Sequence, residues 1–190
     1  MNKILVVNGH PNQDSFNTAI AKAYIKHAES KGASVRYLAI GELKFNPNLE
    51  FGYSKRMDLE PDLLNALEDI SWSDHQVWIH PIWWSGMPAI MKGFFDRAFL
   101  PGIAFKTNEN TNFLQNKTSR IINTAGDMSL DIYEKYLKSS GVIQLKSGIL
   151  EYCGVSSVKT NFIGPLEELT ESDRLEFLES LESIAEEDIA

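Results

Sequence analysis

Three short segments of the chain combine residue types that suit a phosphate group and a flat aromatic ring. The first, Gly9-His-Pro-Asn-Gln-Asp-Ser15-Phe-Asn17, contains a hydroxyl, amides and an imidazole, but no Lys or Arg. It precedes an expected helix, and the N–H groups at a helix N-terminus attract anions without a cationic side chain. The segment therefore indicates an anion site. Taken alone, it is more simply explained by Ser15 as an N-cap and His10 as a loop residue bonded to backbone.

The second segment, Pro81-Ile-Trp-Trp-Ser-Gly-Met-Pro88, places two tryptophans side by side in a loop punctuated by Pro and Gly. Core packing explains such a pair poorly, because successive side chains cannot both face inward. We interpret Trp83 and Trp84 as the border of a flat ligand such as an isoalloxazine ring, to which loop N–H groups would donate. An oligomer interface is a compatible alternative, because Trp is favoured there too.

The third segment, Asn123-Thr-Ala-Gly126-Asp127, has small residues that would let backbone approach a ligand, although any tight turn could use the same residues. Near the second segment, Lys92 and Asp96 are spaced as an ion pair on a helix surface. The four histidines have no spacing typical of a metal site, and we expect no bound metal. Cys153 is expected to be a small buried apolar residue.

Alternating strands and helices are expected to position these segments. Apolar runs predict five strands, and helical patterns and turn residues predict the segments between them, including long irregular connections at 41–58 and 100–117. The expected strands are 3–8, 34–40, 75–80, 118–124 and 155–163, and the expected helices are 16–30, 61–70, 89–99, one or two within 130–152, and 171–187. The pattern predicts an α/β fold of one domain, residues 1–190, with three layers and a doubly wound parallel sheet in the order 2-1-3-4-5. Ligands of such sheets bind at the carboxyl ends of the strands, where the three segments lie.

The composition excludes several classes of protein. A chain of 190 residues with 43% hydrophobic and 23% charged residues is typical of a globular domain. The net charge of -8 arises from residues 165–190, which have ten acidic residues and one basic residue, Arg174. We interpret this acidity as the solvated face of an amphipathic helix with Leu175, Leu178, Leu181 and Ile184, and expect no nucleic-acid partner. The apolar run from Ile4 to Val7 is too short for a signal peptide, so we expect a cytoplasmic protein.

Together, the motifs resemble the NAD(P)H:quinone oxidoreductases of the flavodoxin-like fold. That family includes quinone reductases, bacterial drug-activity modulators and ancillary reductases of potassium efflux systems. The resemblance covers nearly the whole chain, and its residues are His10, Ser15-Phe-Asn17, Pro81-Ile-Trp-Trp84, Met87-Pro-Ala89, Lys92-Gly93, Asp96-Arg97, Gly102-Ile-Ala-Phe105 and Ser147-Gly-Ile-Leu-Glu-Tyr-Cys-Gly154.

The resemblance implies a flavin held by all three loops, in a homodimer whose active sites lie between the subunits. FMN is favoured over FAD, because relatives that hold FAD have additional chain. The residues expected near the flavin phosphate are His10, Ser15, Phe16 and Asn17; those along the ring are Pro81, Ile82, Trp83, Trp84 and Ser85; those at its other edge are Asn123, Thr124, Ala125 and Gly126.

The chain departs from the family at several positions. Asn123-Thr-Ala-Gly126 stands where a Thr-Thr-Gly-Gly type sequence is usual, and Ser85 stands where an aromatic residue is common, so we expect a reshaped acceptor pocket. No His follows His80, so the Tyr and His pair that handles protons in some relatives cannot be transferred. Tyr133 is retained as a candidate proton donor, with an ordinary residue of a helix surface as the alternative.

The expected reaction is a two-step, ping-pong transfer of a hydride from NAD(P)H through the flavin to a quinone or a related acceptor. Two alternatives remain at this stage. An electron-carrier flavodoxin would pass single electrons to protein partners and oxidise little NAD(P)H directly. A regulatory subunit of a potassium efflux transporter would bind flavin without needing turnover, and it would co-purify with that membrane protein.

Overall fold

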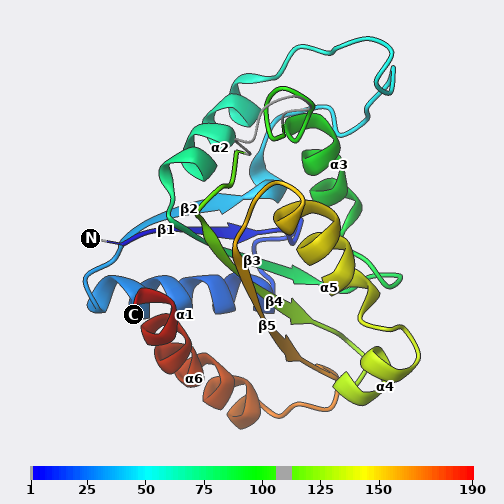
Figure 1. Cartoon of the computed structure of the whole chain (residues 1–190). Helices are drawn as coiled ribbons and strands as arrows, with labels where there is room; N and C mark the ends of the chain where they lie inside the picture. The colour runs from blue at the N-terminus through cyan, green and yellow to red at the C-terminus, as the bar shows by residue number, and fades with distance from the viewer. Residues whose placement is uncertain (1, 106–112) are drawn as a thin grey trace.

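The computed structural model describes residues 2–105 and 113–190 and contains one sheet of five parallel strands in the order β2-β1-β3-β4-β5. The strands end at the same edge, which we call the carboxyl edge (Figure 1). Their bounds are β1 (Lys3–Asn8), β2 (Ser34–Ala39), β3 (His75–Pro81), β4 (Thr118–Thr124) and β5 (Ser157–Ile163). The expected fold class and strand order are confirmed, with ends that differ by one or two residues.

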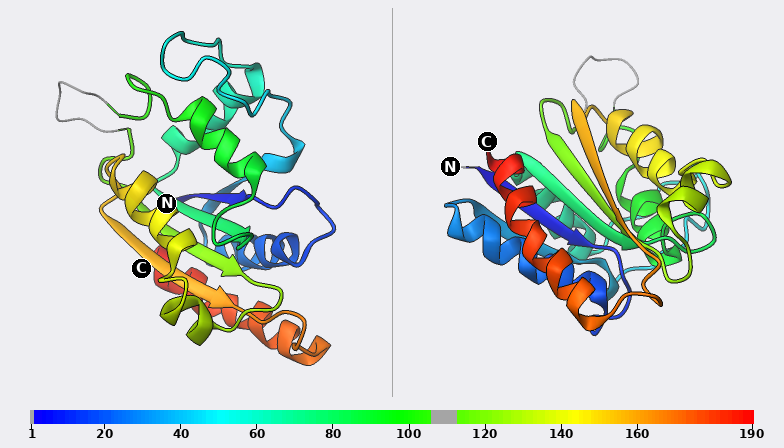
Figure 2. Two further views of the ribbon diagram at one scale, coloured as in Figure 1. Left: turned by 90° about the vertical axis from the view of Figure 1, so that its right-hand side faces the viewer. Right: turned by 90° about the horizontal axis from the view of Figure 1, so that it is seen from below.

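Helices cover both faces of the sheet and make a three-layer structure (Figures 1 and 2). One face is covered by α1 (Phe16–Ser30) and α6 (Glu171–Ile189), and the other by α2 (Pro61–Trp72), α3 (Ala89–Ala98) and α5 (Ser140–Leu145). Helix α5 continues as a π-helical segment, η2 (Lys146–Glu151), and the short helix α4 (Leu130–Lys135) precedes it. No helix among the described residues is both long enough and apolar enough to cross a membrane.

Two hydrophobic cores, one on each face of the sheet, hold these layers together. Along β1, Ile4 and Val6 belong to the core under α1 and α6, whereas Leu5 and Val7 belong to the core under α2 and α3. Side chains alternate between the faces of a strand, so a strand covered on both faces needs a continuous apolar run. The run at the start of the sequence therefore predicts a central strand correctly.

Helix α6 corrects one expectation about which residues face the core. Leu175 is 53% exposed, and the residues fully buried from this helix are Leu181 and Ala185. Three residues fall about 60° short of a full helical turn, so a row at spacings of three drifts away from the core. The start of the helix is fixed by a capping box between Thr170 and Asp173.

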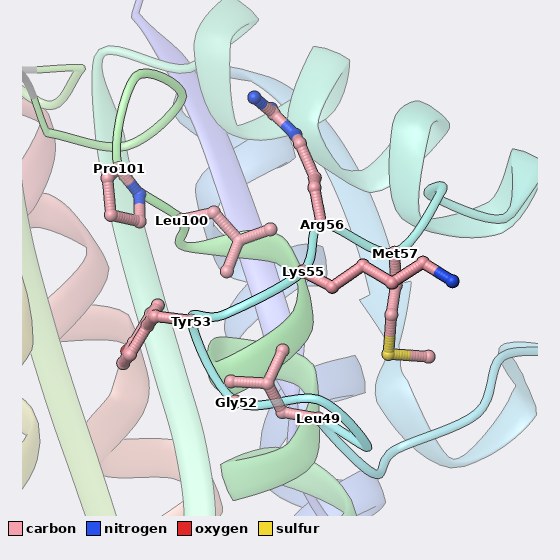
Figure 3. Close-up of a pocket in the computed structure, with 8 residues that line it drawn as sticks. All are labelled: Leu49, Gly52, Tyr53, Lys55, Arg56, Met57, Leu100 and Pro101. Atoms are coloured by element: carbon pink, nitrogen blue, oxygen red, sulfur yellow. The ribbon is translucent and has the colours of Figure 1, made fainter.

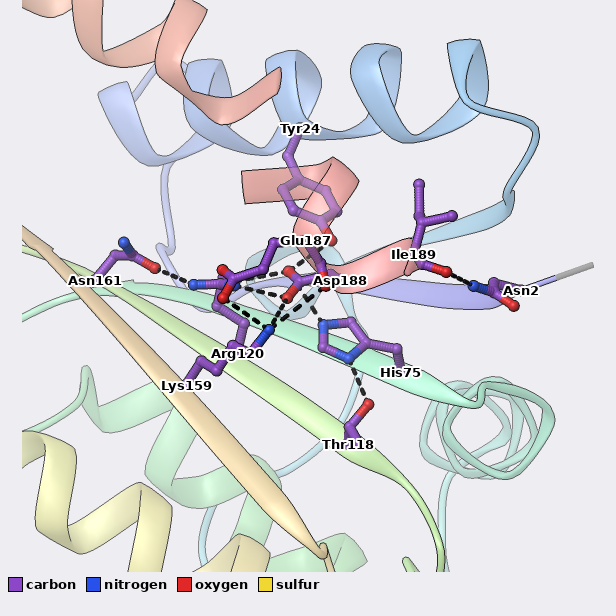
Figure 4. Close-up of polar contacts among 10 residues, drawn as sticks. All are labelled: Asn2, Tyr24, His75, Thr118, Arg120, Lys159, Asn161, Glu187, Asp188 and Ile189. Atoms are coloured by element: carbon purple, nitrogen blue, oxygen red, sulfur yellow. Dashed lines mark hydrogen bonds and ion pairs between the residues drawn. The ribbon is translucent and has the colours of Figure 1, made fainter. Parts of the chain in front are cut away.

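The acidic residues of α6 are solvent-exposed, as expected, except Asp188, whose side chain is buried near the end of the helix. Arg120 from β4 bonds Asp188 and Glu187, each at 2.6 Å, and Tyr24 of α1 donates to Asp188 at 3.0 Å (Figure 4). The side chains of Arg120 and Asp188 are 3% and 0% exposed. The end of the acidic helix is therefore tied to the interior by a buried ion pair, and we call these residues and His75 the amino-edge cluster.

The long connection after β2 is fastened to α3 by a buried arginine. It begins with a 3-10 turn, η1 (Ile40–Glu42), and continues to α2. Arg97, 1% exposed, donates to the backbone oxygens of Asn46 and Asp58 and forms an ion pair of 2.9 Å with Glu60. Its neighbours Lys92 and Asp96 form the expected surface pair at 2.6 Å. In the other long connection, residues 106–112 lie outside the described residues.

Candidate functional site

The loops after β1, β3 and β4 contact one another at the carboxyl edge, as the strand order requires. The Thr124 hydroxyl donates to Asn17 Oδ1 at 3.1 Å, and Ile82 N–H donates to Thr124 O at 2.7 Å. The rings of His10 and Trp83 meet edge to face, with centroids 5.4 Å apart. Three segments separated by dozens of residues therefore form one continuous surface.

The start of α1 offers donors for an anion. Ser15 is the N-cap, because its hydroxyl accepts the N–H of Thr18 at 3.3 Å, so the simpler interpretation of this residue is confirmed. Asn17 is 2% exposed, and its Nδ2 finds no partner among the described residues; the same holds for the buried Nε2 of Gln13. Since the first N–H groups of a helix also lack intrahelical acceptors, donors are concentrated here.

Helix α6 places a guanidinium group beside the start of α1. The Arg174 guanidinium lies 5.3 Å from the centroid of the Phe16 ring, which also packs against Phe177 at 6.4 Å. Phe16 thus contacts α6, and Arg174 places a positive charge beside the Phe16 ring while it donates to the carbonyl oxygen of Leu166 at 2.6 Å. The sequence signal was present but unused, because Arg174 is the one basic residue in the acidic C-terminal region.

The tryptophan loop is a tight two-residue hairpin with a strained backbone. Trp83 and Gly86 exchange two backbone hydrogen bonds, of 2.9 and 3.0 Å. Between them, Trp84 and Ser85 have φ values of 49° and 62°, the left-handed region that favours glycine or asparagine. Trp83 is 44% exposed and Trp84 is fully exposed. The two rings are therefore not a closed pair of walls, since only Trp83 packs against His10.

This strain yields a stability prediction. Ser85→Gly is expected to raise the free energy of unfolding by about 0.5–1 kcal/mol, because glycine accepts positive φ without a steric penalty. Urea denaturation would measure it. Ser71→Gly, in α2, is the matched control and should lose about 0.5 kcal/mol, because a helix disfavours glycine. Equal losses at both positions would show that the turn stores no strain.

Tyr133 is not a residue of a helix surface, which corrects the alternative given for it. It is 1% exposed, and its ring stacks on Phe162 with centroids 5.4 Å apart. Its oxygen accepts the N–H of Val142 at 2.9 Å, and burial raises its pKa. Tyr136, by contrast, is 78% exposed. The bond from Val142 uses the Tyr133 oxygen and leaves its hydroxyl hydrogen available, so Tyr133 remains a candidate proton donor.

Two histidines lie close to the loops, and both favour the neutral state. Burial lowers the pKa of His10, against a smaller effect of its hydrogen bond to Asn12. His80, at the end of β3, is completely buried beside Asn123, and burial lowers its pKa to about 4. Sequence reasoning assigned His80 no role, because an isolated His in a strand carries no spacing signal.

Two cavities among the described residues lie away from the three loops. One of about 190 Å³ lies between the long connection and the segment after α3, lined by Leu49, Gly52, Tyr53, Lys55, Arg56, Met57, Leu100 and Pro101 (Figure 3). Another, of about 460 Å³, is lined by Cys153, by residues of α3 and η2, and by the aromatic side chains of Tyr53, Phe95, Phe99, Phe105 and Tyr152. Burial raises the pKa of Cys153 to about 11, so its thiol is unreactive. Neither of these two cavities includes a residue of the three loops.

Comparisons with known proteins agree with this architecture. A family model described as "Flavodoxin-like fold" matches residues 2–186. The chain is 29% identical over 182 residues to an "Uncharacterized NAD(P)H oxidoreductase" of Haemophilus influenzae, covering 92% of this chain and 90% of that one. It is 26% identical over 214 residues to the rat "NAD(P)H dehydrogenase [quinone] 1", covering 97% and 78%.

Solved structures show the same fold. The crystal structure of Smu.1420 from Streptococcus mutans is 34% identical, with a TM-score of 0.82 and coverage of 97% of this chain and 99% of that one. An "FMN-dependent NADH-azoreductase" from Bacillus anthracis, in complex with FMN, is 14% identical with a TM-score of 0.74, covering 98% and 99%. The chain therefore belongs to the flavodoxin-like-fold family of NAD(P)H:quinone oxidoreductases that its motifs resemble.

Proposed function

We propose that residues 1–190 form one flavin-binding domain that passes two electrons from NAD(P)H to a quinone or similar small acceptor. Among the described residues, the buried side-chain polar atoms without hydrogen-bond partners include three at the carboxyl edge, Gln13 Nε2, Asn17 Nδ2 and Asn123 Oδ1, and this grouping is the observation that supports a bound group most directly. Buried polar groups in proteins nearly always have hydrogen-bond partners, so such a set fits a ligand. FMN matches their chemistry, because its phosphate accepts hydrogen bonds and its ribityl chain and ring also donate them.

Different residues at the carboxyl edge would bind different parts of the flavin. The start of α1, with Gln13 and Asn17, would hold the phosphate, and Arg174 would add positive charge behind Phe16. The hairpin would present the ring of Trp83 and the backbone N–H groups of Trp84 and Ser85 to the isoalloxazine. Small residues at Ala125 and Gly126 would let the other edge of the ring approach backbone.

Bound flavin would supply the redox chemistry, accepting a hydride from NAD(P)H and giving it to the acceptor in a second half-reaction. The protein's own contribution is to hold donor and acceptor in turn against an open surface, which lowers the entropic barrier of each transfer. We expect positioning to be the protein's main contribution, with the hydroxyl hydrogen of Tyr133 as the candidate proton source.

Reconstitution with FMN and with FAD tests the proposal. We expect a yellow protein that bleaches anaerobically with NADPH or NADH and regains its colour with a benzoquinone. FMN is expected to bind more tightly than FAD. Protein that takes up neither flavin would contradict the proposal. Slow bleaching together with accumulation of a one-electron-reduced flavin would instead favour an electron carrier.

Asn17 provides a sharper test of the phosphate site. Asn17→Leu is expected to weaken FMN binding about tenfold and riboflavin binding hardly at all, because riboflavin lacks the phosphate. Fluorescence quenching gives both constants. Riboflavin binding by the same Asn17→Leu variant serves as the control. Equal losses for both ligands would place Asn17 away from the phosphate.

We also propose a homodimer, as the family resemblance implies. Exposed aromatic residues near the larger cavity support it, since Tyr53 and Tyr152 are 74% and 60% exposed. Aromatic residues are enriched at protein interfaces. Light scattering during size-exclusion chromatography measures the oligomeric state. Co-purification with a potassium efflux protein would favour the regulatory-subunit alternative.

A further inference from the structure

The strained centre of the tryptophan hairpin, Trp84 and Ser85, is contacted from outside by helix α5. The hydroxyl group of Ser140, the first residue of α5, donates to the carbonyl oxygen of Ser85 at 2.8 Å. The hairpin's own two hydrogen bonds join Trp83 and Gly86 to each other and leave the two central residues unbonded. Among the described residues, Ser140 is therefore the only hydrogen-bond partner of the hairpin's centre.

One side of α5 lies close against the hairpin around this bond. Ser140, Gly141 and Gln144 share that side, because successive residues of a helix are about 100° apart around its axis. A Cβ atom placed on Gly141 would lie 3.4 Å from the carbonyl oxygen of Ser85. A Cβ atom placed on Gly86 would lie 3.3 Å from Oε1 of Gln144. The helix and the hairpin therefore touch along several residues, and glycines permit the close approach.

The backbone of the hairpin needs such support, because it is unfavourable by itself. The φ values of 49° at Trp84 and 62° at Ser85 bring Cβ close to the following carbonyl oxygen in both residues. Strain of this kind persists only where the surrounding structure holds it in place. The hydrogen bond from Ser140 holds one peptide group of the turn, and the side of α5 behind it restricts movement in that direction.

We propose that Ser140 is a positioning residue for the ligand site: its hydrogen bond to Ser85 keeps the hairpin in its strained turn, in which the backbone N–H groups of Trp84 and Ser85 remain available to the flavin ring. These two N–H groups have no hydrogen-bond partner among the described residues. Donors that are already in place bind a ligand without the cost of ordering them. The inference rests on the flavin-binding function proposed above and extends it to α5, which belongs to none of the three loops.

FMN dissociation constants of Ser140 variants test the proposal. Ser140→Ala removes the hydrogen bond and is expected to weaken FMN binding about fivefold, the effect of one neutral hydrogen bond. Ser140→Thr keeps a hydroxyl group at the same place and should bind FMN like the wild type. Ser139→Ala is the matched control, because the neighbouring Ser139 hydroxyl makes no hydrogen bond among the described residues, and it should leave FMN affinity unchanged.

NMR scalar couplings that depend on φ give a readout that needs no flavin and that a merely structural role of α5 would not move. In Ser140→Ala these couplings should change at Trp84 and Ser85, whereas Ser139→Ala should leave them as in the wild type. Unchanged couplings in Ser140→Ala would overturn the inference. So would an FMN affinity of Ser140→Ala equal to that of a wild type that binds FMN, whereas a wild type that binds no flavin would contradict the proposed function itself.

Discussion

Replacing Arg97 by Ala is expected to lower the free energy of unfolding by about 3 kcal/mol. The guanidinium is almost fully buried and bonds the Glu60 carboxylate and the backbone oxygens of Asn46 and Asp58. Removing one partner of a buried ion pair leaves the other polar groups without compensation, which costs much more than the net gain from forming the pair. Urea denaturation at pH 7 measures the loss.

Lys92→Ala is the matched control on the same helix. Lys92 and Asp96 form an exposed i,i+4 pair, so the loss should be about 0.3–0.5 kcal/mol. Arg97→Ala should also increase protease cleavage within residues 47–57, because the connection loses its fastening at both ends. A stability loss as small as that of the control would show that the connection is held by its other contacts.

The second large effect is expected in the amino-edge cluster, where Asp188→Asn should cost about 2 kcal/mol at pH 7. Asp188 is buried and neutralises Arg120, and it accepts the hydroxyl of Tyr24. Asparagine keeps the shape but leaves the guanidinium with Glu187 as its remaining anionic partner. The cluster includes His75 at the start of β3, whereas the three loops follow the ends of the strands, so FMN affinity should be unchanged.

The loss of stability in Asp188→Asn should depend on pH. Burial alone would raise the pKa of Asp188, but hydrogen bonds and charges from His75 and Arg120 outweigh it and lower the pKa below its ordinary value. A carboxyl with a lowered pKa in the folded state contributes stability above its unfolded value of about 3.9 and loses it as the pH falls further. The difference in the free energy of unfolding between the wild type and Asp188→Asn should therefore become smaller below about pH 4. A difference in the free energy of unfolding that stays constant from pH 7 to pH 3 would contradict a stabilising ion pair at Asp188.

Much of the fold was predictable because local patterns and the global topology agree. The apolar runs of β1 and β3 indicate strands buried on both faces, and Ser15 and Gly32 mark the start and end of α1. The errors fall where a long-range partner decides the outcome. Leu175 matches a helical repeat yet remains exposed, because the position of the sheet selects the Leu181 and Ala185 face.

By itself, the sequence determined the strand order, the family and the three loops that meet at the carboxyl edge. These follow from hydrophobic periodicity and motif order, which are local properties of the chain. Only the tertiary structure decided that Arg174 stands behind Phe16, that Arg97 fastens the long connection and that the Asn123 amide packs against the buried His80 ring. Each of these pairings joins residues from different elements, and burial together with hydrogen-bond geometry, which no spacing encodes, sets their charge and orientation.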